Sequence, residues 1–195
     1  MKVQKHSCKW ALIFTLPLLM FWGCEDDPTN PENGNEQELI TTVTLSLTEN
    51  GTSNVVSATF KDLDGDGGTA PTIGMLTLNA GSTYTGKVEL LDESKNPAED
   101  ITEEVKEEAE AHQFFYTPQG ALDGRLTVTV TDKDSNNLPV GLEFTVAVSA
   151  GGAVTGSATN SLNVVLSHFD NTPKNGADRS DESDIDINIP VTITD

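Results

Sequence analysis

The chain has 195 residues, with 31 acidic against 11 basic side chains and a formal net charge of −20 at pH 7. A negative field of this size repels nucleic acid and anionic lipid headgroups, so the composition excludes binding to DNA or RNA and docking on a membrane through a basic patch. The length suits one domain of ordinary size behind an N-terminal segment.

The N-terminal segment has the pattern of an export signal. Basic residues precede an apolar run, Trp10–Trp22, which is too short to cross a bilayer of about 30 Å as a helix. The run ends in Gly23 and Cys24, and three acidic residues follow. A small residue before a cysteine resembles the lipobox of bacterial lipoproteins, in which the signal is cleaved before the cysteine and the cysteine carries the lipid. The alternatives are an ordinary secretory signal that contains a cysteine, and an uncleaved anchor, which Pro17 disfavours.

This resemblance implies three parts of the chain: a signal peptide (1–23), a flexible acidic tether (24–37) and a folded domain (38–195). Cys24 is the expected lipidation site. The acidic residues directly after it resemble the signal that sends Bacteroidota-type lipoproteins to the outer membrane, on the cell surface or on its periplasmic face. Cys8 would leave with the signal peptide, so no disulfide can form within the domain and an apolar core must hold it together.

Residues 39–48 alternate apolar and polar side chains, which predicts a half-buried strand. Asn50 and Gly51 favour a turn into a second strand over residues 55–61. Further segments with strand patterns lie at residues 74–79, 83–91, 113–117, 126–130, 142–148, 162–168 and 185–194. In the last of these, the alternation places Ile185 inward and Asp184 outward.

One segment breaks the strand pattern. Asp100 suits a helix N-cap with Glu103 in capping-box spacing, and Ile101, Val105 and His112 fall on one helical face. We therefore expect one short helix within residues 94–111, with His112 next to its end on the same face. Residues 171–183 are polar and predict a long loop.

About nine strands with frequent turns predict an all-β domain. The leading architecture is an Ig-like antiparallel β-sandwich with the helix inserted at one end. A small closed β-barrel is the alternative, because periodicity does not separate the two.

Four segments carry a family resemblance: residues 38–43, 62–68, 100–104 and 112–116. Together they resemble a group of small flavobacterial outer-membrane lipoproteins that are often labelled as having a type 1 periplasmic-binding fold. That two-lobed fold needs many helices between parallel strands, and this chain offers one, so we expect the sandwich instead. Such lipoproteins look like partners of TonB-dependent receptors, so the resemblance implies an accessory role beside a receptor of this class.

The sharpest local motif is a run of alternating carboxylates at Asp62, Asp64 and Asp66, with glycines between and after them. Oxygen ligands at this spacing match the first half of an EF-hand loop and predict a Ca²⁺ site. The bidentate glutamate of that loop is replaced by Ile73, so further ligands would have to come from elsewhere. The alternative is a plain Asp/Gly turn between strands.

Two histidines give a second candidate site. His168 continues the inward row of its strand, and His112 shares the apolar face of the predicted helix. If they meet at one end of the sandwich, with Glu108 nearby, they can bind Zn²⁺ or Cu²⁺. The alternative is that each is a hydrogen-bonded residue at the edge of the core.

The remaining features favour a binding protein over an enzyme. Phe114 and Tyr116 suit the core, and we expect the helix to cover the opposite face of their strand. No nucleophile elbow, phosphate loop or His-Glu-x-x-His motif is present, so an enzyme is not expected. The leading hypothesis is a lipid-anchored binding module. The alternatives are a transition-metal capture protein and a structural or adhesive domain stiffened by calcium.

Overall fold

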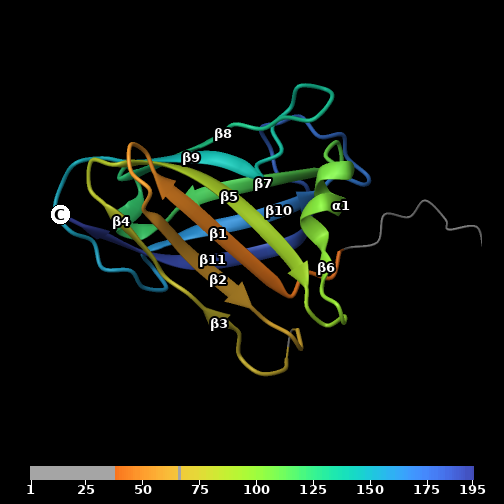
Figure 1. Ribbon diagram of the computed structural model, residues 1–195. Coiled ribbons are helices and arrows are strands. Elements are labelled where there is room, and N and C mark those ends of the chain that lie inside the picture. Colours follow the sequence, from red (N-terminus) through yellow and green to blue (C-terminus); the bar gives the residue numbers. More distant parts are fainter. Residues whose placement is uncertain (1–37, 66) are drawn as a thin grey trace, which may run out of the picture. The chain divides into compact units, whose positions relative to one another are not determined.

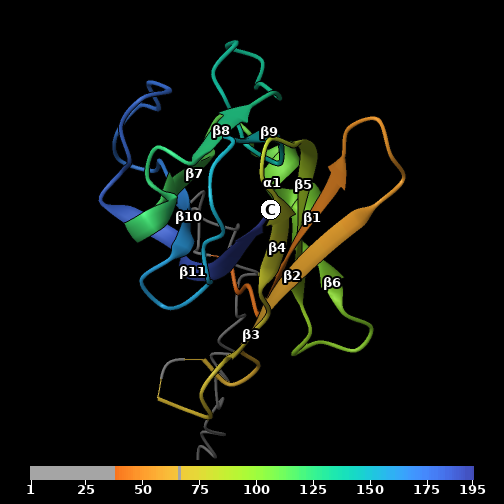
Figure 2. The ribbon, with the colours of Figure 1, turned by 90° about the vertical axis from the view of Figure 1, so that its left-hand side faces the viewer.

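The computed structural model describes residues 38–65 and 67–195, so the predicted signal peptide, Cys24, the tether and Asp66 lie outside the described residues. The described chain folds into two β-sheets and one short α-helix, which confirms the predicted all-β sandwich with a single inserted helix. Figure 2 shows the sheets as two layers. Within those two ranges, no helix is long and apolar enough to cross a membrane.

The first sheet has the strand order β3-β2-β1-β5-β9-β8, and β6 pairs with β5. Every pairing in it is antiparallel, as the predicted hairpins require. Its strands are β1 (Thr42–Glu49), β2 (Val55–Lys61), β3 (Thr72–Ile73), β5 (Thr83–Asp92), β6 (Glu99–Asp100), β8 (Leu126–Val130) and β9 (Glu143–Val148).

The second sheet has the order β4-β11-β10-β7 and comprises β4 (Leu76–Asn79), β7 (His112–Pro118), β10 (Ser161–His168) and β11 (Glu182–Thr194). The predicted antiparallel arrangement is not complete, because β4 pairs with β11 in parallel. That pairing covers only Val191–Thr194 of the long last strand. Along the first half of β11, the edge opposite β10 therefore has no strand partner among the described residues.

The helix α1 (Ile101–Glu107) begins where we expected but ends earlier than its apolar spacing suggested. The side chain of Asp100 accepts a hydrogen bond from Thr102 N at 3.0 Å, which caps the first turn. Thr102 Oγ1 hydrogen-bonds to the backbone of Leu90, so this end of α1 is fixed to β5. The prediction that His112 continues the face of the helix is wrong: it begins β7. A 3-10 turn (Gly120–Leu122) follows β7.

The outer face of the second sheet is covered by a loop and not, as expected, by the helix. Every residue of β10 is buried, which requires a cover on both of its faces. Arg179 lies over the ring of Phe115, 5.7 Å from its centroid, and donates a hydrogen bond to Asn163 Oδ1 at 3.1 Å. Lys174 forms a buried ion pair of 2.9 Å with Asp134. Residues 171–181 of the predicted loop thus form a third layer. The prediction placed the end of the loop too late, because residues 182 and 183 already belong to β11.

The core lies between the sheets and is built from the inward rows that alternation predicts. Leu45 in β1 and Leu166 in β10 are each 0% exposed, and the apolar residues of β11 continue the same core. Complete burial of one such side chain contributes about 1.5–3 kcal/mol.

We expect Leu45→Ala to lower the free energy of unfolding by about 3 kcal/mol, because the lost contacts and the cavity both cost stability. Urea unfolding measures the change. The matched control is Val55→Ala, since Val55 in β2 is 61% exposed, and this change should stay within about 0.5 kcal/mol. Equal effects of the two changes would contradict this description of the core.

Candidate metal centre

Two buried histidines meet at one end of the second sheet, the end at which α1 leads into β7 (Figure 1). His112 is the first residue of β7, His168 is the last residue of β10, and the two are direct partners across the antiparallel pair. Their ring centroids lie 4.4 Å apart, and neither residue is more than 1% exposed. The fold therefore brings together the two histidines on which the sequence-based metal hypothesis depends.

Two carboxylates complete the group. Glu38 Oε1 lies 3.2 Å from His112 Nε2, and Asp184 Oδ1 lies 3.3 Å from His168 Nδ1. The other oxygen of Asp184 lies 3.6 Å from His112 Nε2 and accepts no hydrogen bond. One ligand atom from each of the four residues lies within 4.8 Å of the others, so this group can hold a metal ion. The rest of the described chain offers no second group of this kind.

A change of register turns Asp184 toward the histidines. Leu166 of β10 pairs with Ile185, but the next residue, Ser167, pairs with Ser183, so Asp184 has no partner across the strand pair. Such a bulge breaks the strict alternation and re-aims a side chain. Simple alternation pointed Asp184 outward, and that prediction is wrong. A period of two carries no signal of the inserted residue, which is why sequence reasoning missed this ligand.

The other missed ligand, Glu38, is the first described residue and lies ahead of β1. Its side chain is only 8% exposed. Sequence reasoning placed it at the boundary between tether and domain, where no periodicity assigns a side chain to a face. Glu108, which we expected near the histidines, contributes its backbone carbonyl instead: that oxygen lies 3.1 Å from His112 Nδ1.

One of the two histidines has an outer hydrogen-bond partner that orients its ring. The contact with the Glu108 carbonyl assigns the proton of His112 to Nδ1 and leaves Nε2 toward the carboxylates. A carbonyl partner of this kind fixes the ring and raises its basicity in histidines that bind metals. His168 Nδ1 lies toward Glu38 and Asp184, and its Nε2 lies 3.1 Å from Asp170 Oδ1 but makes no hydrogen bond.

The negative charges of the two carboxylates dominate the electrostatics of the group. Burial lowers the pKa of His112, but the hydrogen bond and the negative charge of Glu38 outweigh it, so that the pKa lies above its usual value. Burial raises the pKa of Glu38, and the contact with His112 outweighs this and holds the pKa below its usual value. Burial, together with the charge of Glu38, raises the pKa of Asp184 to about 6. Without an ion, protons therefore offset part of the negative charge.

The predicted calcium motif forms a turn. Asp62 Oδ1 accepts a hydrogen bond from Gly65 N at 3.0 Å, and Asp64 Oδ2 accepts one from Thr69 N at 2.9 Å. These contacts hold the chain in the Asp/Gly turn that was the alternative interpretation. Asp66 lies outside the described residues, so calcium binding by the three aspartates stays a prediction.

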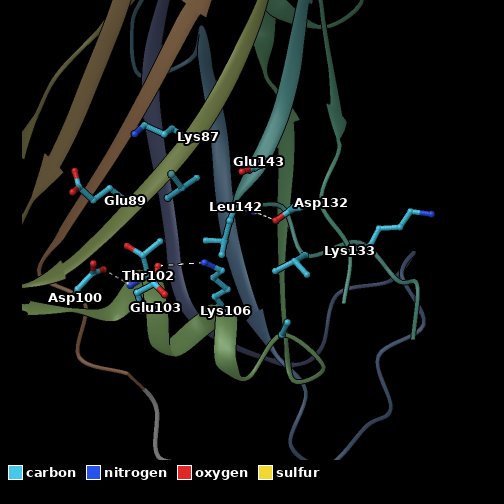
Figure 3. A pocket seen from close by; sticks show the side chains of 13 residues that line it. Lys87, Glu89, Asp100, Thr102, Glu103, Lys106, Asp132, Lys133, Leu142 and Glu143 are labelled. Carbon is cyan, nitrogen blue, oxygen red and sulfur yellow. Dashed lines mark hydrogen bonds and ion pairs between the residues drawn. The ribbon is translucent and has the colours of Figure 1, made fainter. Parts of the chain in front are cut away.

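A second cleft, of about 440 Å³, lies between α1, β5 and β9 (Figure 3). Its polar groups mainly serve the fold. Asp100 caps α1, and Asp132 accepts hydrogen bonds from Gly141 N and Leu142 N at 2.8 and 2.9 Å. Lysines and carboxylates alternate around it, with Lys106 lying 3.5 Å from Glu103. Charges of both signs line this cleft and no cluster of like charges forms in it, so we prefer the metal centre as the candidate site.

Comparison of the chain with protein-family models, curated proteins and solved structures finds no match. The resemblance to flavobacterial lipoproteins therefore stays a prediction. The chemistry of the site follows from its four side chains: two imidazole nitrogens and two carboxylates, a donor set that suits divalent transition metals.

In the metal-free protein, Asp184 should make stability depend on pH. Its pKa of about 6 exceeds the ordinary value of 3.8, so the stability that protonated Asp184 provides is complete below about pH 4 and is lost as the pH rises through about 6. We expect Asp184→Asn to stabilise the metal-free protein at pH 7 by about 2 kcal/mol and to have little effect at pH 4. Urea unfolding with a chelator present at both pH values measures this, and an equal effect at the two values would contradict it.

Proposed function

We propose that this protein captures a divalent transition-metal ion, Zn²⁺ or Cu²⁺, at Glu38, His112, His168 and Asp184. The observation that carries the proposal is the convergence of four ligand atoms, within 4.8 Å of one another, from four separate segments of the chain. Chance contact between exposed acidic groups does not account for it, because both histidines and Asp184 have side chains that are at most 1% exposed.

The charge of the group supports a divalent ion. Two ionised carboxylates and two neutral imidazoles give a charge of −2, which one divalent cation neutralises. Without that cation, carboxylates taken out of water face each other at a cost in stability. The absence of thiolate or thioether donors among the four ligands favours Zn²⁺ or Cu²⁺ over Cu⁺.

The same geometry supports binding without catalysis. A catalytic zinc site usually has three protein ligands and keeps a position for water or substrate, whereas four protein ligands close a tetrahedral site. We infer a capture module, not an enzyme, from this four-ligand set.

The cellular setting rests on the sequence. The lipobox-like Gly23-Cys24 and the acidic residues after it support export and lipid attachment at the outer membrane. In that setting a metal-capture module suits an accessory to a TonB-dependent receptor, to which it would present the ion. This partner follows from the lipoprotein resemblance and is part of the proposal.

Calorimetric titration of residues 24–195 with Zn²⁺ and Cu²⁺ tests the metal site. We expect a dissociation constant below about 1 μM, because the buried donors are already close together. His112→Ala should weaken binding by at least about 100-fold, since it removes a ligand. Asp123→Asn, at an exposed position outside the metal-binding group, is the matched control and should keep full equilibrium affinity. Wild-type affinity in His112→Ala would rule out the site.

Expression of the full chain in a host that processes lipoproteins tests the setting. We expect the mature protein to begin at Cys24 with lipid attached, as mass spectrometry of the membrane fraction would show. Cys24→Ser should release the domain from that fraction, and Cys8→Ser should not. An unmodified Cys24 in a protein that stays with the membrane would contradict this part of the proposal.

A further inference from the structure

We infer that the species captured is the hydrated divalent cation, that it reaches the centre through one acidic cleft, and that Asp62, Asp64 and Asp186 guide it there. This inference rests on the proposed function and deepens it, since it names the form of the metal and its route.

The cleft lies beside the first half of β11 and has a volume of about 610 Å³. Its lining comes from residues 38–41 ahead of β1, from Phe60 of β2 and the turn at residues 62–65, and from residues 184–187 of β11. Glu38 and Asp184 belong both to this lining and to the metal-binding group. The cleft therefore reaches two of the four residues of the group.

The walls of the cleft carry one sign of charge. Its acidic residues are Glu38, Asp62, Asp64, Asp184 and Asp186, and no lysine or arginine lines it. A cleft with charge of one sign and walls of low dielectric constant focuses the field and raises the local concentration of counter-ions.

The three outer aspartates are held in place by the fold. Asp62 and Asp64 each accept a backbone hydrogen bond within their turn, and Asp186 Oδ1 accepts one from Asn163 Nδ2 at 2.7 Å. Fixed carboxylates can exchange a passing ion's water without a rearrangement of the chain. None of the three belongs to the group that holds the ion, so they can speed its entry without binding it at the site.

Asp184, one of the residues that line the cleft, also carries a hydrogen-bond acceptor without a donor. Its Oδ2 is fully buried, lies 3.6 Å from His112 Nε2 and accepts no hydrogen bond. A buried acceptor in this state costs free energy, and a cation that arrives from the cleft would satisfy it. This observation is independent of the charge on the walls.

The volume of the cleft and the negative charge of its walls define the class of substrate. A cation with about six waters of roughly 30 Å³ each needs about 200 Å³, which the cleft provides. The volume would also admit a small chelate, but a negatively charged one, such as the zinc–citrate complex, meets the same field with the opposite sign. We therefore assign the aquated ion, not an anionic chelate, as the species that enters.

Stopped-flow measurement of Zn²⁺ uptake by the same soluble chain (24–195) tests the route. The guide variant is Asp62→Asn, Asp64→Asn and Asp186→Asn together. The matched control is Glu89→Gln, Glu107→Gln and Asp123→Asn, which changes the net charge equally at exposed positions outside the cleft. At low salt we expect the guide variant to lower the association rate constant about tenfold and leave the dissociation rate constant nearly unchanged. The control should change it less than twofold, and about 1 M salt should remove the difference.

The outcomes separate the route from the site. If wild-type protein binds Zn²⁺ through His112 but the guide variant and the control take it up equally fast, the route is wrong and the proposed function stands. If wild-type protein binds no Zn²⁺ at equilibrium, both fail. Faster uptake from zinc citrate than from free Zn²⁺ would overturn the assigned substrate class. Circular dichroism melting checks that the variants fold. If the triple variant does not fold, Asp64→Asn alone, in the exposed turn, repeats the test.

Discussion

Two carboxylates and two imidazoles lie within 4.8 Å of one another at one end of the second sheet. The interaction between their charges is the constraint on which this end of the sandwich depends. Glu38 and Asp184 repel each other, and burial strengthens the repulsion, as the raised pKa of Asp184 shows. His112 offsets part of it by binding a proton more readily than usual. Without a bound cation, the repulsion between the two carboxylates lowers the stability of the folded protein. The metal-free and metal-bound proteins should therefore differ in stability even where their backbones agree.

The fold achieves this convergence with ordinary β-sheet devices. Direct pairing of His112 with His168 across β7 and β10 sets the imidazoles side by side. The register shift at Ser167 turns Asp184 inward. The segment ahead of β1 supplies Glu38, and the carbonyl of Glu108 orients the His112 ring from outside. Three of the four residues, His112, His168 and Asp184, lie in strands. The spacing of their donors is therefore set by strand pairing, which resists deformation better than a loop does.

Sequence reasoning predicted the parts of this structure that obey a period. Alternation identified the inward rows of β1, β10 and β11 and placed His168 on one of them, and the capping pattern at Asp100 identified the start of α1. The end of α1 was missed because His112 also fits a helical spacing from Ile101 and Val105. Glu38 and Asp184 escaped for a different reason. One precedes all regular structure and the other occupies a bulge, and neither position has a period to read. The parallel pair of β4 and β11 is likewise a long-range contact that no local pattern encodes.

The position of Glu38 has a mechanical consequence. Glu38 lies ahead of β1, the first strand of the domain, and is also a member of the candidate metal-binding group. An ion bound there would tie the entering chain to β7, β10 and β11 through its own coordination bonds. Tension on the preceding chain would then bear directly on the ion, and by linkage an ion in place would resist that tension. Mechanical tension on the chain ahead of Glu38 would thus weaken ion binding, and a bound ion would strengthen the attachment of that chain to the domain.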